Sequence, residues 1–266
     1  MNTIQGLSNL TGRRALVTGA AGFLGQVIAD VLAELGADLI LVDLPNSNLL
    51  EVKKHIESKW RVKPTTYFCD LEFSDQRMEF ISNFTKSYSK LNILINNAAF
   101  VGTSGLAGWN VEFEQQSTET FRRALEVNLT AAFDLSKGFS SALIDSKGVI
   151  INIASTYGLF APDWNLYEGT KMGNPAAYGA SKAGLIQLTR WLASTLAPSV
   201  RVNSISPGGI FRDQPQEFVK RYEEKTPLGR MATEDDLKGA VAYLASDMSK
   251  YVTGQNLLVD GGWGIL

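Results

Sequence analysis

Short apolar runs alternate along this chain with longer segments in which apolar residues recur at every third or fourth position. The runs predict strands at 14–18, 39–42, 63–69, 91–95, 148–153, 200–205 and 255–259. The periodic segments predict helices that end at 35, cover 48–59, 74–89, 118–144 and 234–246, and follow Tyr178. Buried parallel strands read as continuous apolar runs, and short helical crossovers favour such a sheet. We therefore expect a single doubly wound α/β domain with a parallel sheet of about seven strands and helices on both faces.

Composition and charge argue against several classes of partner and location. Of the 266 residues, 45% are hydrophobic and 20% are charged, which is typical of a globular protein. The formal net charge of −2 argues against nucleic acid or an anionic membrane as the main partner. Segment 1–11 is polar and lacks the apolar core of a signal peptide, and no apolar run is long enough to span a bilayer. We expect a cytoplasmic protein.

Cysteine and histidine occur once each, which excludes several kinds of site. Cys69 has no second cysteine with which to form a disulfide, and it ends an apolar-leaning strand where a small buried side chain is expected. His55 lies among lysine and glutamate residues on a segment that reads as a solvated helix. A Ser-His-Asp triad and a metal site are therefore not expected.

The first predicted strand leads into a glycine-rich turn at 19–25, with the sequence GAAGFLG, and the second strand ends at Asp43. Such glycines let the backbone approach a pyrophosphate, the following helix N-terminus stabilises its charge, and a carboxylate at this spacing binds ribose hydroxyls. An ordinary tight turn is the alternative, but the context favours a dinucleotide. Because Asp43 repels a 2′-phosphate and Gly22, Pro45 and Asn46 supply no basic group, we expect NAD rather than NADP.

Five predicted strands end in polar or turn residues, namely Asp43, Asp70, Asn97, Ser155 and Pro207. Ligands of doubly wound sheets bind at the carboxyl ends of the strands. Each residue alone could be a helix cap or a plain turn. Their convergence at one edge of the sheet favours a binding site.

Tyr178 and Lys182 lie four residues apart at the front of an apolar helical run, so their side chains share one face. That face continues through Leu185, Thr189 and Leu192, which points the pair inward. A nearby ammonium and a helix N-terminus should lower the pKa of the tyrosine from about 10, and Tyr178 could then exchange a proton with an alcohol or carbonyl. The alternative is a chance pair with a solvated lysine.

These motifs together resemble those of the short-chain dehydrogenase/reductase family over residues 11–262. The matching signatures are Thr18-Gly19, Asp43, Asp70, Asn96-Asn97-Ala98-Ala99, Asn128, Ser155, Tyr178-x-x-x-Lys182, Pro207-Gly208 and Asp260-Gly261-Gly262. The resemblance implies a Rossmann-like fold and four catalytic residues. Tyr178 would donate or accept the proton, Ser155 would polarise the carbonyl, Lys182 would lower the tyrosine pKa and bind the nicotinamide ribose, and Asn128 would hold the water of a proton relay.

The resemblance also implies a set of cofactor contacts along the strand ends. They are Gly19, Gly22, Phe23, Leu24, Gly25, Asp43, Asp70, Leu71, Asn97, Ala98, Ala99, Tyr178, Lys182, Pro207, Gly208 and Ile210. The length is similar to the shorter-chained branch of the family, whose turn usually reads TGxxxGxG. Here Phe23 takes the middle position and glycine has moved to Gly22, a spacing that resembles the longer branch acting on nucleotide sugars.

One NAD(P)-binding domain, 1–266, is expected, with an insertion at 157–175 that lengthens the interval between the expected catalytic serine and tyrosine. Tyr157, Trp164 and Tyr167 offer stacking faces and polar groups that suit a polyhydroxylated substrate. A surface elaboration or a subunit contact is the alternative. The insertion is similar to that of members associated with flagellin glycosylation and nonulosonate-type sugar pathways.

A second segment, 208–230, is expected to form a substrate lid around a short mobile helix between two proline-glycine turns. Arg212 is the candidate for binding an anionic group of the substrate, because guanidinium matches carboxylate or phosphate bidentately. The alternative is that Arg212 only pairs with Asp213 or Glu217.

The leading hypothesis is an NAD-dependent oxidoreductase that transfers hydride between nicotinamide and a secondary alcohol or ketone of a sugar-like metabolite. A 3-oxoacyl thioester reductase and a nucleotide-binding scaffold or sensor without turnover are the alternatives. A homotetramer or homodimer is expected, because two predicted helices and the tail carry apolar residues without an obvious local core. These residues are Phe121, Leu125, Phe133, Ile186, Leu188, Trp191 and 263–266.

Overall fold

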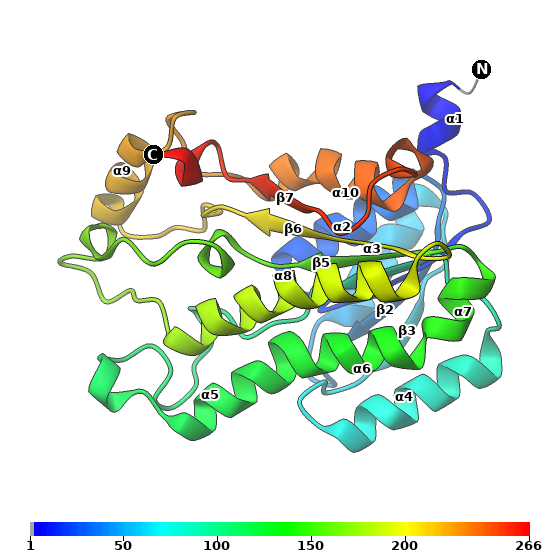
Figure 1. Ribbon diagram of the computed structural model, residues 1–266, viewed down its shortest axis with the longest axis horizontal. Coiled ribbons are helices and arrows are strands. Elements are labelled where there is room, and N and C mark those ends of the chain that lie inside the picture. Colours follow the sequence, from blue (N-terminus) through cyan, green and yellow to red (C-terminus); the bar gives the residue numbers. More distant parts are fainter. Residues whose placement is uncertain (1–2) are drawn as a thin grey trace.

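Seven strands form one sheet in the computed structural model, which describes residues 3–266 (Figure 1). They are β1 (Arg14–Thr18), β2 (Asp38–Asp43), β3 (Thr65–Phe68), β4 (Ile93–Asn96), β5 (Val149–Ile153), β6 (Arg201–Pro207) and β7 (Asn256–Val259). All neighbours pair in parallel, in the order β3-β2-β1-β4-β5-β6-β7. The predicted sheet is therefore confirmed. Met1 and Asn2, which open the predicted domain and the polar segment 1–11, lie outside the described residues.

Helices cover both faces of this sheet. The helices of the described residues are α1 (Ile4–Ser8), α2 (Phe23–Glu34), α3 (Leu49–Trp60), α4 (Ser74–Ser87), α5 (Thr118–Leu125), α6 (Ala131–Gly138), α7 (Ser140–Asp145), α8 (Ala176–Leu196), α9 (Gln216–Lys225) and α10 (Lys238–Ala245). One core contains buried side chains of α2, α3 and α10, and the other contains those of α4, α6, α7 and α8. Within residues 3–266, no helix is both long and apolar enough to cross a membrane.

The five central strands, β1, β2, β4, β5 and β6, read as continuous apolar runs because each contributes buried side chains to both cores. In β1, Ala15 and Val17 pack toward α2, whereas Leu16 between them packs toward the α4 and α6 side. All three side chains are fully buried. Period-two alternation therefore sends neighbouring apolar residues to opposite faces, and both faces are covered.

The predicted helix 118–144 is confirmed over 118–138, which form one helical run with a π turn in it, but it is interrupted at Phe139, before the separate helix α7. The chain forms α5, then a π-helical turn at Glu126–Thr130, then α6 and α7. Across the π turn, the backbone N–H of Ala131 donates to the carbonyl of Glu126, five residues earlier. Apolar spacing does not reveal such a turn, because the stripe of buried residues continues on either side of it.

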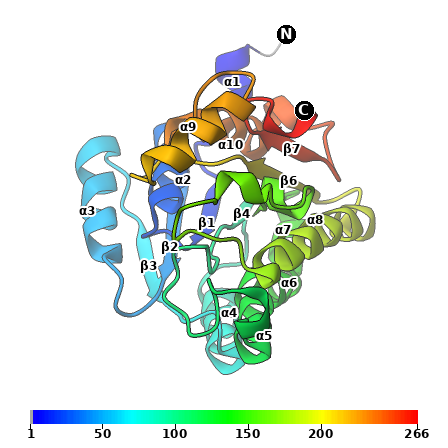
Figure 2. The same cartoon turned by 90° about the vertical axis from the view of Figure 1, so that its left-hand side faces the viewer.

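Segments that are far apart in the sequence meet beyond the carboxyl ends of the strands, the edge that Figure 2 turns toward the viewer. The insertion 157–175, α9 and the C-terminal tail share one apolar cluster. Trp263 is only 4% exposed in that cluster, between Tyr157 and Tyr222, while Ile265 and Leu266 remain exposed. The expectation that the whole tail lacks a local core is therefore wrong.

Candidate active site

The glycine turn has a geometry that favours a dinucleotide pyrophosphate. Gly19 has a φ of +62°, and a Cβ on Gly25 would overlap the carbonyl oxygen of Gly19. Gly22 precedes α2 without a side-chain cap, so the first N–H groups of the helix, which have no intrahelical partner, stay available to an anion. These residues fit a bound nicotinamide dinucleotide.

Asp43 is held by the backbone of the same turn. One carboxylate oxygen accepts a hydrogen bond from the N–H of Ala21 at 2.7 Å, and the other accepts from the N–H of Leu44 at 2.7 Å. The side chain is half-buried, and each oxygen keeps a second lone pair for a ribose hydroxyl. A carboxylate so close to the glycine turn disfavours a 2′-phosphate at this strand end.

The end of β4 is tied to the glycine turn from the other side. The Asn97 amide donates to the carbonyls of Thr18 and Gly19, both at 3.0 Å. The Thr18 hydroxyl accepts from the backbone N–H groups of Asn97 and Ala98. The strand order therefore brings the ends of β1, β2 and β4 together along one edge, where the sequence predicts the cofactor.

The structure brings Ser155, Tyr178 and Lys182 together at the neighbouring strand end. Ser155 follows β5 and accepts a hydrogen bond from the N–H of Tyr157, and Tyr178 is the third residue of α8. Lys182 is 2% exposed, its Nζ donates to the carbonyl of Ile153 at 2.7 Å, and it lies 5.8 Å from the centroid of the Tyr178 ring. The predicted inward direction of the pair is confirmed.

The predicted lowering of the Tyr178 pKa is wrong for the protein alone. Burial raises the pKa of Tyr178, and the neighbouring Ser155 hydroxyl only partly opposes this effect. Burial also lowers the pKa of Lys182 to about 8. The reason for the difference is that the ammonium points to the Ile153 carbonyl. A neutral phenol is the form that donates a proton to a ketone, whereas oxidation of an alcohol requires the phenolate.

Asn128 lies in the π turn, and its side chain is engaged with protein. Its amide oxygen accepts from the N–H of Phe100 at 2.7 Å, and its amide nitrogen donates to the Phe100 carbonyl and to the Ser181 hydroxyl. The side chain thus ties the segment after β4 to α8. Its expected role of holding a water stays a prediction.

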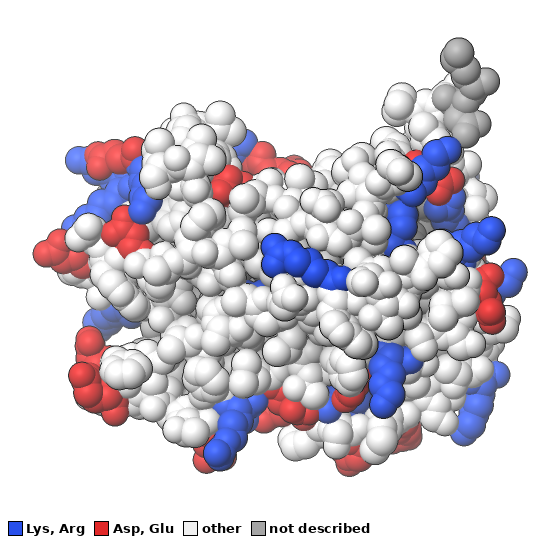
Figure 3. Space-filling view, viewed as in Figure 1, with Lys and Arg blue, Asp and Glu red and all other residues white. Residues whose placement is uncertain are grey.

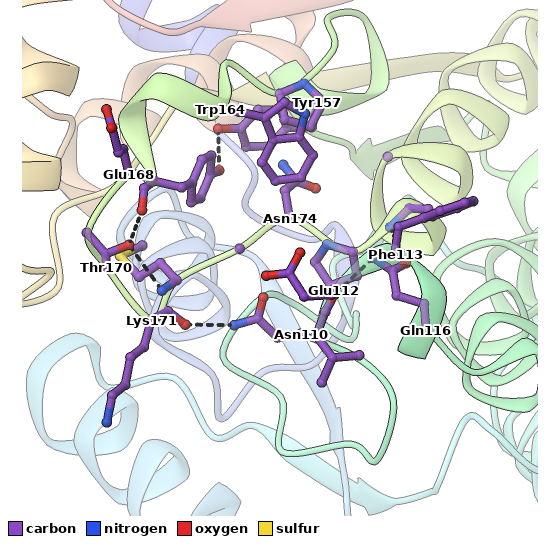
Figure 4. A pocket seen from close by; sticks show the side chains of 18 of the residues that line it. Asn110, Glu112, Phe113, Gln116, Tyr157, Trp164, Glu168, Thr170, Lys171 and Asn174 are labelled. Atoms are coloured by element: carbon purple, nitrogen blue, oxygen red, sulfur yellow. Dashed lines mark hydrogen bonds between the residues drawn. The ribbon is translucent and has the colours of Figure 1, made fainter.

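A cavity of about 960 Å³ opens between the insertion and the 110–116 segment (Figure 4). Tyr157, Trp164 and Tyr167, which the sequence predicts as substrate contacts, line it. The Tyr157 and Tyr167 hydroxyls lie 2.6 Å apart, and burial raises the pKa of both, so they are neutral at physiological pH. Trp164 is 59% exposed and offers its ring at the wall.

Several residues that line this cavity escaped the sequence interpretation, namely Asn110, Glu112, Phe113, Gln116 and Asn174. Asn174 is 8% exposed, and its hydrogen-bonding influence lowers the pKa of Tyr157 and of Tyr167 against the larger effect of burial. The available signal was a long stretch after Ala99 without helical or strand periodicity, because connections of that length are usually functional.

Arg212, which the sequence predicts as a substrate contact, does not line this cavity. Its Nε pairs with Glu234 at 2.8 Å, and its guanidinium lies 4.8 Å from the centroid of the Phe23 ring. The alternative of a pair with Asp213 or Glu217 is also not seen among the ion pairs of the described residues.

The predicted lid helix, α9, is fastened to the insertion. Lys225 pairs with Asp163 at 2.7 Å, and this contact lowers the pKa of the Asp163 carboxyl. Arg221 donates to the backbone carbonyls of Asn165 and Glu168. The insertion and α9 therefore form one layer over the carboxyl ends of the strands. Within residues 3–266, no group of three histidine, cysteine or acidic side chains is arranged to hold a metal.

Known proteins are similar to this chain in sequence and in fold. A sequence profile described as enoyl-(acyl carrier protein) reductase matches residues 19–264. An uncharacterised short-chain type dehydrogenase/reductase of Sinorhizobium fredii is 32% identical over 262 residues, which are 95% of this chain and 44% of that protein. The chain thus spans less than half the length of that relative. The post-translational flagellin modification protein A of Campylobacter coli is 30% identical over 259 residues, which are 96% of this chain and 100% of that protein.

A solved structure extends the likeness to three dimensions. It is a protein from Beutenbergia cavernae, described as an NAD(P)-dependent gluconate 5-dehydrogenase, with bound NADP at low occupancy. The TM-score is 0.86 at 31% sequence identity, and the match covers 98% of this chain and 100% of that one.

Proposed function

This chain belongs to the short-chain dehydrogenase/reductase family, whose members are nicotinamide-dependent oxidoreductases of CH–OH or keto groups, and from that premise we propose that it is an NAD-dependent dehydrogenase of a hydroxylated, sugar-like metabolite. The observation that carries the proposal is the meeting of Ser155, Tyr178 and Lys182 beside the glycine turn. A bound nicotinamide supplies or accepts the hydride. Mere nucleotide binding does not require a half-buried tyrosine together with a buried serine and a buried lysine, which disfavours a scaffold or sensor.

In the proposed reaction, each residue handles a proton or fixes a position. Tyr178 gives its phenolic proton to the substrate oxygen in reduction and takes it back in oxidation. The Ser155 hydroxyl donates to the same oxygen and polarises it. Lys182 binds the nicotinamide ribose and, when charged, favours the phenolate. Asn128 holds α8 and the segment after β4 in register, because its amide bonds both.

The proposed preference for NAD rests on Asp43. Its carboxylate oxygens accept hydrogen bonds at 2.7 Å from the N–H groups of Ala21, in the glycine turn, and of Leu44. A 2′-phosphate beside it would be repelled. The bound NADP of the Beutenbergia cavernae protein belongs to that protein, and a direct comparison of the two cofactors on this chain tests the proposal.

The proposed substrate class rests on the cavity. Its neutral hydroxyl pair, its amides and its aromatic Trp164 suit a polyol or sugar, whose hydroxyls need neutral donors and acceptors and whose ring faces stack on indole. The gluconate 5-dehydrogenase description of the solved neighbour supports a hydroxylated substrate. The profile description supports the acyl thioester alternative. The polar cavity wall and Asp43 weigh against that alternative.

A homotetramer or homodimer is part of the proposal. Trp191 of α8 is 55% exposed and Phe133 of α6 is 38% exposed. Figure 3 shows few charged side chains over the middle of the face that these helices present. Ile186, which the sequence interpretation counted with them, is buried and belongs to the core. Light scattering at micromolar concentration tests the assembly, and a monomer would contradict it.

The decisive experiment follows nicotinamide absorbance with NAD and with NADP against a panel of polyols, sugar acids, sugar phosphates, nucleotide sugars and a 3-oxoacyl thioester. We expect turnover with NAD and a sugar-like compound, and a loss of about 10²-fold or more in Tyr178→Phe. Binding of NADH should survive in that variant. Turnover of the thioester with NADPH alone would favour the alternative, and binding without turnover across the panel would favour a sensor.

A further inference from the structure

Arg212 connects two segments that stand on either side of the expected cofactor site. Its Nε pairs with Glu234 at 2.8 Å, and its guanidinium lies 4.8 Å from the centroid of the Phe23 ring. Phe23 is the first residue of α2 and is 67% exposed. A permanent positive charge therefore lies beside the turn whose N–H groups would receive a pyrophosphate.

The backbone beneath Arg212 is fixed while its tip remains accessible. The Arg212 N–H donates to the Gln214 side chain at 2.7 Å, and that side chain donates to the Ile210 carbonyl at 2.8 Å. The N–H of Phe211 donates to the Ala232 carbonyl. The Arg212 side chain is 36% exposed and Glu234 is 23% exposed. An ion pair of this exposure is weak, so the guanidinium can exchange Glu234 for a better anion.

The charge of Arg212 also reaches the catalytic end of the site. It is one of the influences that lower the pKa of Tyr178, although burial outweighs it. Arg212 therefore acts on the glycine turn at one side and on the catalytic tyrosine at the other. In a dinucleotide that runs from the turn to the tyrosine, the group between the two ends is the pyrophosphate.

We propose that Arg212 is a cofactor-binding residue whose guanidinium leaves Glu234 and pairs with the cofactor pyrophosphate over the N-terminus of α2. Guanidinium binds phosphate oxygens bidentately, and Phe23 offers the face on which it rests. Glu234 competes for the same charge when no cofactor is bound. This inference rests on the proposed function, and it assigns Arg212 to the cofactor in place of the substrate anion expected from the sequence.

Calorimetric titration of the full chain with ADP-ribose, NADH and adenosine tests the proposal without turnover. Arg212→Ala should weaken ADP-ribose and NADH about tenfold, or about 1.4 kcal/mol, and leave adenosine, which has no phosphate, unchanged. Arg212→Lys should recover part of the affinity, because it keeps the charge and loses the planar fork. Glu234→Gln should tighten ADP-ribose, and this gain should vanish when Arg212 is also replaced.

Lys220→Ala is the matched control, because it removes one positive charge from the same lid at a side chain that is 79% exposed. It should leave all three affinities unchanged. If Arg212→Ala binds ADP-ribose as tightly as the wild type, the proposal is overturned, and a raised substrate KM in that variant would return Arg212 to the substrate. If the wild type binds neither ADP-ribose nor NADH, the proposed function itself fails. Thermal unfolding of the free variants checks their fold, and Arg212→Gln replaces Arg212→Ala if that variant is unstable.

Discussion

The glycine turn and the insertion both lie at the carboxyl ends of the strands, but different interactions build them. The turn is shaped by local backbone geometry, such as the close approach of Gly19 and Gly25, and the N–H of Ala21 ties it to the Asp43 carboxylate, 22 residues further along the chain. The insertion is held by side chains from distant segments, such as the pair Lys225–Asp163, 62 residues apart in sequence. One region is therefore a property of a short motif, and the other is a property of the folded chain.

Because they are built differently, the glycine turn and the insertion suit different roles in the proposed reaction. The turn and Asp43 are proposed to bind a cofactor that is the same in every cycle, and a rigid backbone cradle suits that role. The insertion, α9 and the tail meet through an aromatic cluster and the partly exposed ion pair Lys225–Asp163. Such contacts can be changed one side chain at a time without disturbing the sheet, and this suits a region that selects the substrate.

The largest expected effect comes from Lys182, whose side chain is buried at the proposed catalytic site. Lys182→Met should abolish turnover and yet raise the free energy of unfolding of the free protein at pH 7 by up to about 3 kcal/mol, because burial lowers the pKa of Lys182 from 10.5 to about 8. Below about pH 8, Lys182 is charged in the folded and in the unfolded protein, and burial of this charge lowers the free energy of unfolding. Between about pH 8 and 10 the folded protein loses the proton first, so the wild type should gain stability and the difference should shrink.

Chemical denaturation of both proteins from pH 7 to pH 10 measures this effect. Lys137→Met, at an exposed position of α6, is the control and should change stability little at any pH. A Lys182→Met protein that is less stable than the wild type at pH 7 would show that the Ile153 hydrogen bond outweighs the cost of burial.

The second prediction concerns Asp43, whose carboxylate is proposed to bind the ribose of the cofactor. Asp43→Asn should weaken NAD about 10- to 100-fold, the value of one charged hydrogen bond of about 1.5–3 kcal/mol, and should relax discrimination against NADP. Asparagine keeps an acceptor for the Ala21 N–H, so the turn itself should survive. Binding titrations with both cofactors measure the change. Equal affinity of the wild type for NAD and NADP would contradict this interpretation of Asp43.

The same contrast explains which features of the structure could be predicted from the sequence and which could not. The sheet follows from apolar runs that serve two cores, and the glycine turn and Asp43 follow from spacing, so both are readable over a few residues. The π turn between α5 and α6, which contains Asn128, could not be predicted, because it inserts one residue into an unbroken apolar stripe.

The candidate site shows the same limit. The direction of the Tyr178 pKa depends on burial and on the Ile153 carbonyl that takes the lysine, and neither is visible in a four-residue spacing. The cavity wall from Asn110 to Gln116 and the partner of Arg212 depend on which loops the fold brings together. Sequence patterns report local geometry, whereas these features are long-range contacts.

The third prediction concerns the cavity beside the insertion 157–175, where the substrate is proposed to bind. Asn174 is 8% exposed and stands beside the paired hydroxyls of Tyr157 and Tyr167 at the cavity wall. Asn174→Ala should raise the substrate KM up to about tenfold, because a buried hydrogen-bonding group is worth about 1–3 kcal/mol. NADH affinity should not change. Asn110→Ala, at an exposed position of the opposite wall, should have a smaller effect. An unchanged KM in Asn174→Ala would remove this residue from the substrate site.

The smallest expected effect tests whether the insertion and α9 act as one layer. Lys225 pairs with Asp163 at 2.7 Å and lies 4.5 Å from the Trp263 ring, with 29% of its side chain exposed. Because partly exposed ion pairs contribute little, Lys225→Met should lower the free energy of unfolding by less than about 1 kcal/mol. Hydrogen exchange of residues 163–168 should nevertheless accelerate while that of the glycine turn stays the same, because the insertion depends on contacts that the turn does not share. Lys220→Met removes the same charge from α9 without touching the insertion and should leave exchange unchanged. Equal acceleration in both regions would mean that the two halves of the site open together, and the distinction between them would fail.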